Sequence, residues 1–302
     1  MKQPTRSWLR EISNPTRRYD AVRHLMDVLG LSQRRACLIV GVARSSFQRA
    51  HKHAKDVVTF DKYAELRQWL HTWAAQNPRW GYRRAWIKTK EEGFDVGRDV
   101  VRRVWRQENL RVPSRKRSKP KTLADPTPRV EPAACPNDVW ALDFQFDSDY
   151  HGRSIKVCNV MDEFTREHVG FTADSTIDAA SVVELLDVIA CERGQRPRVV
   201  RMDNGPEFIS KTLQSWAAEE ETVQAFIPPG QPWHNGFVES LHNRMRDELF
   251  EQECFLDLEH ARYCIGQWCH RYNTYHPHSA LGFIPPEEFK KQFLRECLMV
   301  CV

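Results

Sequence analysis

Three acidic residues lie where a carboxylate could do chemistry. Asp143 lies in the middle of the apolar segment 140–146, WALDFQF, which has the pattern of a strand. Asp203 follows a second apolar segment, and Glu239 comes after another 35 residues, in the first turn of an expected helix. A carboxylate inside an apolar strand is costly unless it is paired, hydrogen-bonded or bound to a metal ion. Taken singly, Asp203 could instead serve its Asn-Gly turn, and Glu239 the N-terminus of its helix.

Two carboxylates from strands and one from a helix can converge on a pair of divalent cations about 4 Å apart. Such a pair lowers the pKa of an attacking water or hydroxyl and neutralises the leaving oxygen in phosphoryl transfer. Ligands that are all oxygen favour Mg²⁺ or Mn²⁺ over zinc. We therefore expect Asp143, Asp203 and Glu239 to hold two Mg²⁺ or Mn²⁺ ions.

The segments that position these carboxylates predict an α/β domain. Three strand-like segments joined by short loops, VWALDFQFD, SIKVCNVMDEFT and EHVGFTADST, predict an antiparallel meander. Helices are expected over residues 178–192, 211–221, about 237–251 and 257–275, with short strands at RPRVVRM and VQAFIP. This order predicts a ribonuclease H-like α/β catalytic core, with a mixed five-stranded sheet and flanking helices. Asp203 then lies at the carboxyl end of its strand, where open α/β sheets place their sites.

The first 112 residues carry helical patterns only. A helix over 19–29 ends at Gly30, a second runs from the N-cap Ser32 to Val40, and Ser45 is expected to cap a third. This pattern fits a helix-turn-helix and an ordinary helical hairpin equally well. A further helix is expected over 61–75, and the segment 95–112 forms another whose apolar face excludes its arginines. A second helix-turn-helix-like domain is therefore predicted.

The net charge of +5 conceals an uneven distribution. Residues 1–134 carry 30 Lys/Arg against 13 Asp/Glu, whereas residues 135–302 carry 15 against 27. A basic half joined to an acidic half indicates that the first half meets nucleic acid. The basic side chains expected to contact DNA are Arg83, Arg84, Arg98, Arg102, Arg103, Arg106, Arg115, Lys116 and Arg117.

These patterns divide the chain into five segments. We expect a helix-turn-helix-like segment at 1–55, a second helix-turn-helix-like DNA-binding domain at 56–112, a basic proline-rich linker at 113–136, the catalytic core at 137–255 and a C-terminal helical extension at 256–302.

Composition excludes several classes of protein. The longest apolar run has eight residues, where a membrane helix needs about 20, and no secretory signal is recognised. Nine cysteines without a CxxC pair indicate reduced thiols and a cytoplasmic protein rather than a disulfide framework. Among the other acidic residues, Asp147 and Asp149 are expected to be solvated, and Asp162 and Glu163 could neighbour the site.

The motifs around the three carboxylates resemble a known family. WALDF, RMDNGPEF and PPGQPWHNGFVES resemble the Asp-Asp-Glu core shared by retroviral integrases and bacterial transposases. DNGPEF, GQPWHNGFVES and RYNTYHPHSALGFIPPEEF are similar to motifs of the second-reading-frame transposases of the insertion sequence 3 family. WGYRRAW and VVRRVWRQENLRV resemble the helix-turn-helix-like domain of this family, and LSQRRACLIVGVARSSFQR resembles the start of its second reading frame. The resemblance covers about residues 31 to 290.

The resemblance implies a DNA transposase that cleaves element ends and transfers the freed strands to a target. It implies Asp143, Asp203 and Glu239 as the metal triad and Arg246 as a basic residue seven positions after the glutamate. Arg246 is expected to bind a phosphate next to the scissile one, because a guanidinium suits bidentate contacts. The resemblance further implies double-stranded DNA as partner, a homo-multimer on DNA, a partner or fusion from an upstream reading frame, and a place in the bacterial nucleoid.

Two alternatives stay open from the residues alone. A ribonuclease H-like nuclease without strand transfer would need the same three carboxylates but not the basic N-terminal domains. A DNA-binding regulator with an inactive core would need the basic domains but not an intact triad. The presence of both features favours the transposase.

Overall fold

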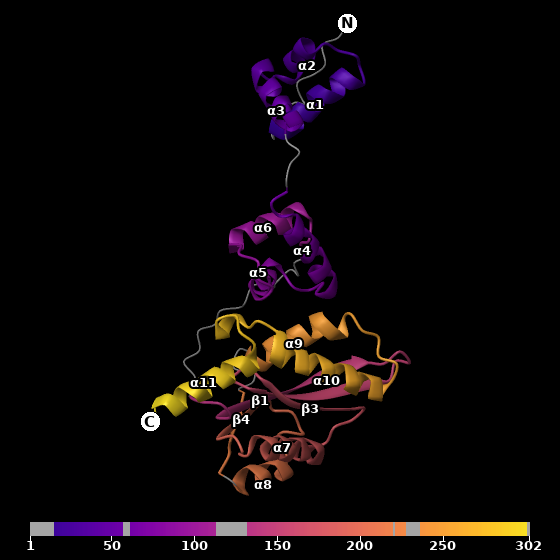
Figure 1. The fold of residues 1–302 in the computed structure, drawn as a ribbon. Coiled ribbons are helices and arrows are strands. Elements are labelled where there is room, and N and C mark those ends of the chain that lie inside the picture. The colour runs from indigo at the N-terminus through magenta and orange to yellow at the C-terminus, as the bar shows by residue number, and fades with distance from the viewer. Residues whose placement is uncertain (1–14, 57–60, 113–131, 220, 228–235, 301–302) are drawn as a thin grey trace. The chain divides into compact units, whose positions relative to one another are not determined.

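The structure is a computed structural model that describes residues 15–56, 61–112, 132–219, 221–227 and 236–300. The chain forms two compact units, Met1–Leu66 and Arg67–Val302. Figure 1 shows the helices and strands of each unit. No helix among the described residues is long and apolar enough to cross a membrane.

The first unit contains three short helices. They are α1 (Pro15–Asp27), α2 (Gln33–Val40) and α3 (Arg44–Asp56), and they enclose a small core of Val22, Ala36, Cys37, Val40 and Phe47. Ser32 caps α2 by accepting the amide of Arg35, and Gly41 ends that helix with a φ of 72°. The expected cap at Ser45 is wrong by two residues, because the carbonyl of Ala43 already accepts the amides of Ser46 and Phe47.

A small helical domain follows in the sequence. The boundary between the units falls within α4 (Ala64–Gln76), after which come α5 (Tyr82–Glu91) and α6 (Arg98–Gln107). Trp73 packs edge-on against Trp80 and Trp105, with ring centroids 5.8 and 6.2 Å away. The buried face of α6 consists of Val101, Val104 and Trp105, which confirms the helix predicted there and leaves its arginines exposed.

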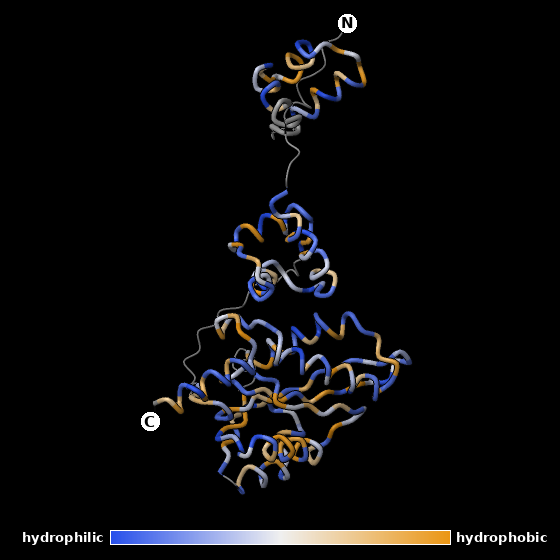
Figure 2. The backbone as a smooth tube through the Cα atoms, viewed as in Figure 1, coloured by the Kyte–Doolittle hydropathy of each residue, from blue (hydrophilic) through white to orange (hydrophobic). Residues whose placement is uncertain are grey.

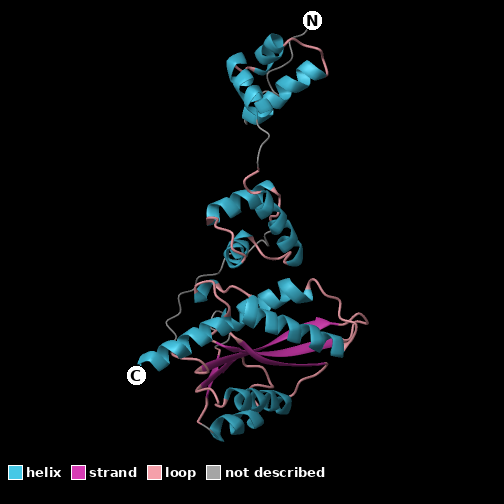
Figure 3. Ribbon diagram, viewed as in Figure 1, coloured by secondary structure: helices cyan, strands magenta, loops and turns pink. Residues whose placement is uncertain are grey.

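The rest of the second unit is built on one five-stranded sheet. Its strands are β1 (Val139–Ser148), β2 (Ser154–Asp162), β3 (His168–Asp174), β4 (Val199–Met202) and β5 (Val223–Phe226), in the order β3-β2-β1-β4-β5. The first three strands pair antiparallel, and β4 and β5 join them in parallel. The mixed five-stranded sheet predicted from the sequence is confirmed (Figure 3).

Helices cover both faces of the sheet (Figure 1). One face packs against α7 (Ala179–Arg193), which is conspicuously hydrophobic in Figure 2, and α8 (Lys211–Glu219). The other face packs against α9 (Gly236–Met245) and α10 (Leu258–Tyr275). Because side chains alternate along a strand, Trp140 and Leu142 enter the first core, whereas Ala141 enters the second.

Two features near the C-terminus were not predicted. The helix expected over 237–251 divides into α9 and the π-helical turn η3 (Arg246–Phe250), which changes the phase of the residues that follow Met245. After the short 3-10 helix η4 (Ser279–Leu281), the extension ends in α11 (Pro286–Val300). Phe289 and Phe293 of α11 pack against Phe164 in the loop after β2, so this helix belongs to the fold of the core.

Candidate active site

The strand register brings the two aspartates together. β1 and β4 pair in parallel with Ala141 opposite Arg201, so continuing this register by two residues puts Asp143 beside Asp203. Neighbouring strands lie about 4.8 Å apart. Asp203 directly follows β4, and its Oδ1 accepts the amide of Gly205 at 2.9 Å, which turns the chain away from the sheet. Asn204 secures this turn by donating from Nδ2 to the carbonyl of Ile227 at 2.6 Å.

The third carboxylate comes from the helix that covers this part of the sheet. Glu239 lies in the first turn of α9, whose buried side chains Val238, Leu241 and Met245 pack in the same core as Ala141 of β1. Glu239 is half-buried, and burial raises the pKa of its carboxyl. The helix thus holds Glu239 over the part of the sheet where Asp143 lies within β1 and Asp203 follows β4.

Electrostatics show that the three carboxylates share one region. The pKa of Asp143 is raised to about 7, mainly because burial disfavours its charged form. The amide of Phe144, 2.8 Å from Oδ1, works against this shift, whereas the negative charges of Asp203 and Glu239 add to it. Within the described part of the chain, none of the three forms an ion pair with a lysine or arginine. The site therefore has an excess of negative charge.

This donor set fits a hard divalent cation. All three donors are carboxylates, which hard divalent cations prefer. Asp143 is partly buried, and the negative charges of Asp203 and Glu239 repel its charge instead of neutralising it. In the described residues no three carboxylate, imidazole or thiolate groups are drawn together as ligands of one ion. The fit therefore rests on the kind of donor and on backbone positions, and the side chains of Asp203 and Glu239 would have to turn toward a bound ion.

A histidine that the sequence reasoning missed contacts the site. His242 lies three positions after Glu239 on α9, and its Nδ1 is 3.5 Å from Oδ2 of Asp143. Behind it lie Asn159 of β2 and His168 of β3, joined to it by hydrogen bonds. Burial lowers the pKa of His242 to about 4 and that of His168 to about 3, so both rings are neutral at physiological pH. Two signals in the sequence could have indicated these residues: His242 lies three positions after Glu239, and Asn159 is a polar residue within an apolar strand.

Arg246 lies at the start of the π-helical turn rather than on a continuous α-helix. One of its amino groups, Nη2, donates to the carbonyl of Phe146 at 3.0 Å, which holds the guanidinium beside β1. The continuous helix expected over about residues 237–251 therefore changes at Met245 to the π-helical turn. Arg246 remains half-buried near the strand that bears Asp143.

The basic residues of the N-terminal 117 positions that are expected to meet DNA fall into three groups. Arg83, Arg98, Arg102, Arg103 and Arg106 are exposed on α5 and α6. Arg84 is instead largely buried and forms an ion pair with Glu248 of η3 at 3.1 Å, so it joins two segments of the second unit. The remaining three, Arg115, Lys116 and Arg117, lie outside the described residues.

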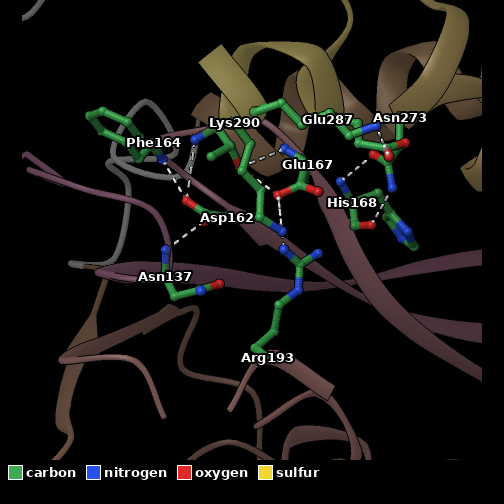
Figure 4. A network of polar contacts seen from close by, with 11 residues as sticks. Asn137, Asp162, Phe164, Glu167, His168, Arg193, Asn273, Glu287 and Lys290 are labelled. Atoms are coloured by element: carbon green, nitrogen blue, oxygen red, sulfur yellow. Dashed lines mark hydrogen bonds and ion pairs between the residues drawn. The ribbon is translucent and has the colours of Figure 1, made fainter. Parts of the chain in front are cut away.

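The other acidic candidates have structural roles. Asp149, expected to be solvated, is buried and closes the turn between β1 and β2 by accepting the amides of His151 and Arg153. Asp162 lies opposite Trp140, three positions from Asp143 along β1, and accepts the amides of Asn137 and Phe164. Figure 4 shows this network and its extension through Glu167. Glu163 forms a two-pronged ion pair with Arg201, each contact 2.9 Å long.

Comparisons with known proteins agree with this architecture. Residues 133–232 and 221–286 match a family described as Integrase core domain, and residues 63–118 match one described as HTH-like domain. An uncharacterized 39.2 kDa protein of insertion element IS476 from Xanthomonas euvesicatoria is 36% identical over 287 residues, which is 95% of this chain and 80% of the relative. A putative transposase of IS986/IS6110 from Mycobacterium tuberculosis is 22% identical, covering 73% and 84%.

A chain in the structure of the simian T-cell lymphotropic virus intasome aligns with a TM-score of 0.48 and 14% identity, over 65% of this chain and 67% of that one. The sheet order and the matched families define the class as an integrase-core polynucleotidyl transferase that acts on DNA. Within that class, the chain belongs to the insertion-element transposases of the insertion sequence 3 type, as its motifs predict.

Proposed function

We propose that this transposase cleaves the ends of its element and joins them to target DNA through Asp143, Asp203 and Glu239. The observation that supports this most directly is the parallel register of β1 and β4, which puts Asp143 beside Asp203 under the helix that bears Glu239. Three carboxylates without a described lysine or arginine partner are the donor set for two Mg²⁺ or Mn²⁺ ions. When bound, these ions supply Lewis acidity and neutralise developing charge on the phosphate oxygens.

The protein's own residues then position the reaction. In cleavage, a water oxygen forms a bond to phosphorus at the element end, and the bond to the 3′ oxygen breaks to leave a free 3′ hydroxyl. In joining, that hydroxyl forms a bond to a target phosphorus and displaces a 3′ oxygen of the target strand. Neither step needs a nucleophile from the protein, so catalysis depends on holding both DNA strands in line at the three carboxylates.

DNA contacts are proposed for two surfaces. The exposed arginines of α5 and α6 (Arg83, Arg98, Arg102, Arg103 and Arg106) would follow the phosphate backbone of the element end. Arg246, held beside β1 by its bond to Phe146, would contact a phosphate close to the scissile one. We also propose that the active form is a multimer on DNA and that the linker residues Arg115, Lys116 and Arg117 add phosphate contacts.

The test is a reaction with labelled duplexes that carry the ends of the element, a supercoiled target and Mg²⁺ or Mn²⁺. The proposal predicts nicked ends and joined products, both absent with Asp203→Asn. Nicks without joined products would leave a nuclease. Binding without nicks in either metal would leave a DNA-binding regulator, and both results would contradict the proposed function.

A further inference from the structure

Four buried or half-buried side chains form one line behind the candidate active site. Nε2 of His168 lies 2.9 Å from Oδ1 of Asn159, and Nδ2 of Asn159 lies 3.1 Å from Nε2 of His242. Nδ1 of His242 lies 3.5 Å from Oδ2 of Asp143. The line thus crosses from β3 through β2 to α9 and ends at β1 on the carboxylate proposed to bind metal.

The chemistry of the amide gives this line a direction. With the amide of Asn159 oriented as it is here, its nitrogen donates to Nε2 of His242, and the ring of His242 then carries its proton on Nδ1. Nδ1 faces Asp143. On the other side, Oδ1 of Asn159 accepts, so His168 must carry its proton on Nε2. Every donor in the line therefore points toward Asp143.

The far end of the line is fixed to the fold. Asn273 of α10 accepts the amide of His168 at 2.9 Å and donates to its carbonyl at 2.8 Å, as Figure 4 shows. Asn159 is fully buried, and His168 is 3% exposed. Gln145, two positions after Asp143, donates to the carbonyl of His242 at 3.2 Å and so ties α9 to β1. The donors consequently have little freedom to turn away.

We propose that His242 is a positioning residue, and that the line from His168 through Asn159 sets its tautomer so that it always presents a proton to Asp143. Phe144 donates to Oδ1 of Asp143, and Nδ1 of His242 faces Oδ2 at 3.5 Å, so each oxygen has a neighbour that can orient it and keeps lone pairs for a cation. Partners of metal-binding carboxylates commonly change metal affinity by about 10- to 100-fold. This inference rests on the proposed function, because it assigns a role in holding the ligand Asp143.

Two substitutions of His242 separate its two nitrogens. Asparagine places an amide nitrogen where Nδ1 lies, so His242→Asn keeps the donor to Asp143 and loses the contact with Asn159. Glutamine reaches the position of Nε2, so His242→Gln keeps the contact with Asn159 and loses the donor. We expect Mn²⁺ binding to the full chain, measured by titration calorimetry, to be at least about tenfold weaker for His242→Gln and within about threefold for His242→Asn.

A matched control removes a buried hydrogen bond elsewhere in the same domain. Thr222 is buried and donates from its hydroxyl to the carbonyl of Pro197 at 2.8 Å, so Thr222→Val should lower stability without changing Mn²⁺ affinity. Equal affinities for His242→Gln, His242→Asn and the unaltered chain would overturn the positioning role. Equal losses in Thr222→Val and His242→Gln would also overturn it, because the effect would then follow stability alone.

A second measurement needs no metal and therefore separates this inference from the proposed function. Nitrogen-15 NMR of histidine-labelled chain should show His242 protonated on Nδ1 and His168 on Nε2, with signals assigned by their loss in His242→Asn and His168→Gln. In Asn159→Asp the carboxylate can only accept, so the proton of His242 should move to Nε2. His242 protonated on Nε2 in the unaltered chain would overturn the directed line. Absence of Mn²⁺ binding with the expected tautomers would instead overturn only the metal site.

Discussion

Asp138 directly precedes β1 and Asp143 lies in the middle of this strand, and the two carboxylates have opposite surroundings. Arg198 contacts both oxygens of Asp138 at 2.7 and 3.1 Å, and this hydrogen bonding lowers the pKa of its carboxyl. Asp143 has no such partner among the described residues, and burial with the repulsion of two further carboxylates raises its pKa. The same domain therefore contains acidic side chains that are paired with an arginine and others that have no described cationic partner; we call these matched and unmatched acids.

The same contrast extends to neighbouring residues. Glu163, close to Asp138 in the fold, binds Arg201. Glu167 binds Arg193 and Lys290, as Figure 4 shows. Near Asp143, Asp203 and Glu239 increase the negative charge instead. A carboxylate that stabilises a fold is paired with a cationic side chain of the same protein, whereas a carboxylate that binds a ligand can lack such a partner. The lack of a lysine or arginine partner around Asp143 supports the proposed metal site there.

The largest effect on catalysis is expected at Asp143, which has no described lysine or arginine partner. Asp143→Asn removes the charge of a proposed metal ligand with little change of shape, so cleavage and joining should fall by at least roughly a thousandfold, the equivalent of several kcal/mol in the barrier. The measurement is the rate of both reactions with labelled ends at saturating Mg²⁺. DNA binding by the same variant should be nearly unchanged. Activity within about tenfold of the unaltered chain would exclude Asp143 from the site.

Substitution at the ion pair of Glu163 and Arg201 should lower the stability of the protein rather than its catalytic rate. Glu163→Gln leaves the guanidinium of Arg201, whose side chain is only 11% exposed, without its buried counter-charge. Breaking a buried pair on one side commonly costs about 3–5 kcal/mol of unfolding free energy. Urea denaturation should show this loss, while Mn²⁺ affinity of the folded protein changes less than about threefold. A variant with lower catalytic activity but unchanged stability would contradict the structural role that we assign to Glu163.

The pH dependence of stability should distinguish Asp143 from Asp138, because the pKa values of their carboxyls shift in opposite directions. The pKa of Asp143 is raised to about 7 in the folded, metal-free chain, so the protonated form contributes stability below about pH 4 that is lost as pH rises through 7. Asp143→Asn should therefore match the unaltered chain below about pH 4 and be more stable at pH 8, by on the order of 4 kcal/mol. Urea titrations in EDTA measure this difference, and saturating Mg²⁺ should reduce it. If Asp143→Asn were less stable than the unaltered chain at pH 8, the charge of Asp143 could not be unpaired in the folded protein.

A smaller effect is expected at Arg246. Its bond to the carbonyl of Phe146 leaves other N–H groups to contact a phosphate, so Arg246→Ala should lower the joining rate by roughly tenfold, the value of one charged hydrogen bond. Arg246→Lys should recover part of the loss, because the charge remains and the planar fork does not. The comparison is of joining rates at saturating Mg²⁺, with circular dichroism to confirm the fold. Equal rates for alanine and arginine would place Arg246 outside the DNA contact.

The sequence was sufficient where the signal is local. Asp143 interrupts an apolar strand, and the order of strands and helices determines the sheet that positions it. Arg83 and Arg84 show the limit: they are adjacent and chemically identical, and only the tertiary contact of Arg84 with Glu248 distinguishes them. Exposure of Arg83 and burial of Arg84 could not be derived from spacing alone.

The contacts around His242 were also beyond local patterns. Asn159 and His168 meet it only because β2 and β3 pair with a bulge at Val160–Met161 and because α9 lies over them. The π-helical turn after Met245 has no sequence signature, which is why a continuous helix was expected through Arg246. Asp149 likewise looked like an exposed turn residue, yet it accepts hydrogen bonds from the turn that buries it.

The pairing of β1 with the short strand β4 has a consequence for how genes of this kind can vary. Asp203 follows the four-residue strand β4 (Val199–Met202), of which the first three residues pair with β1, and side chains alternate between faces along a strand. A one-codon deletion there would turn the aspartate to the opposite face of the sheet. Length variants that persist in nature should therefore be absent from the four codons before Asp203.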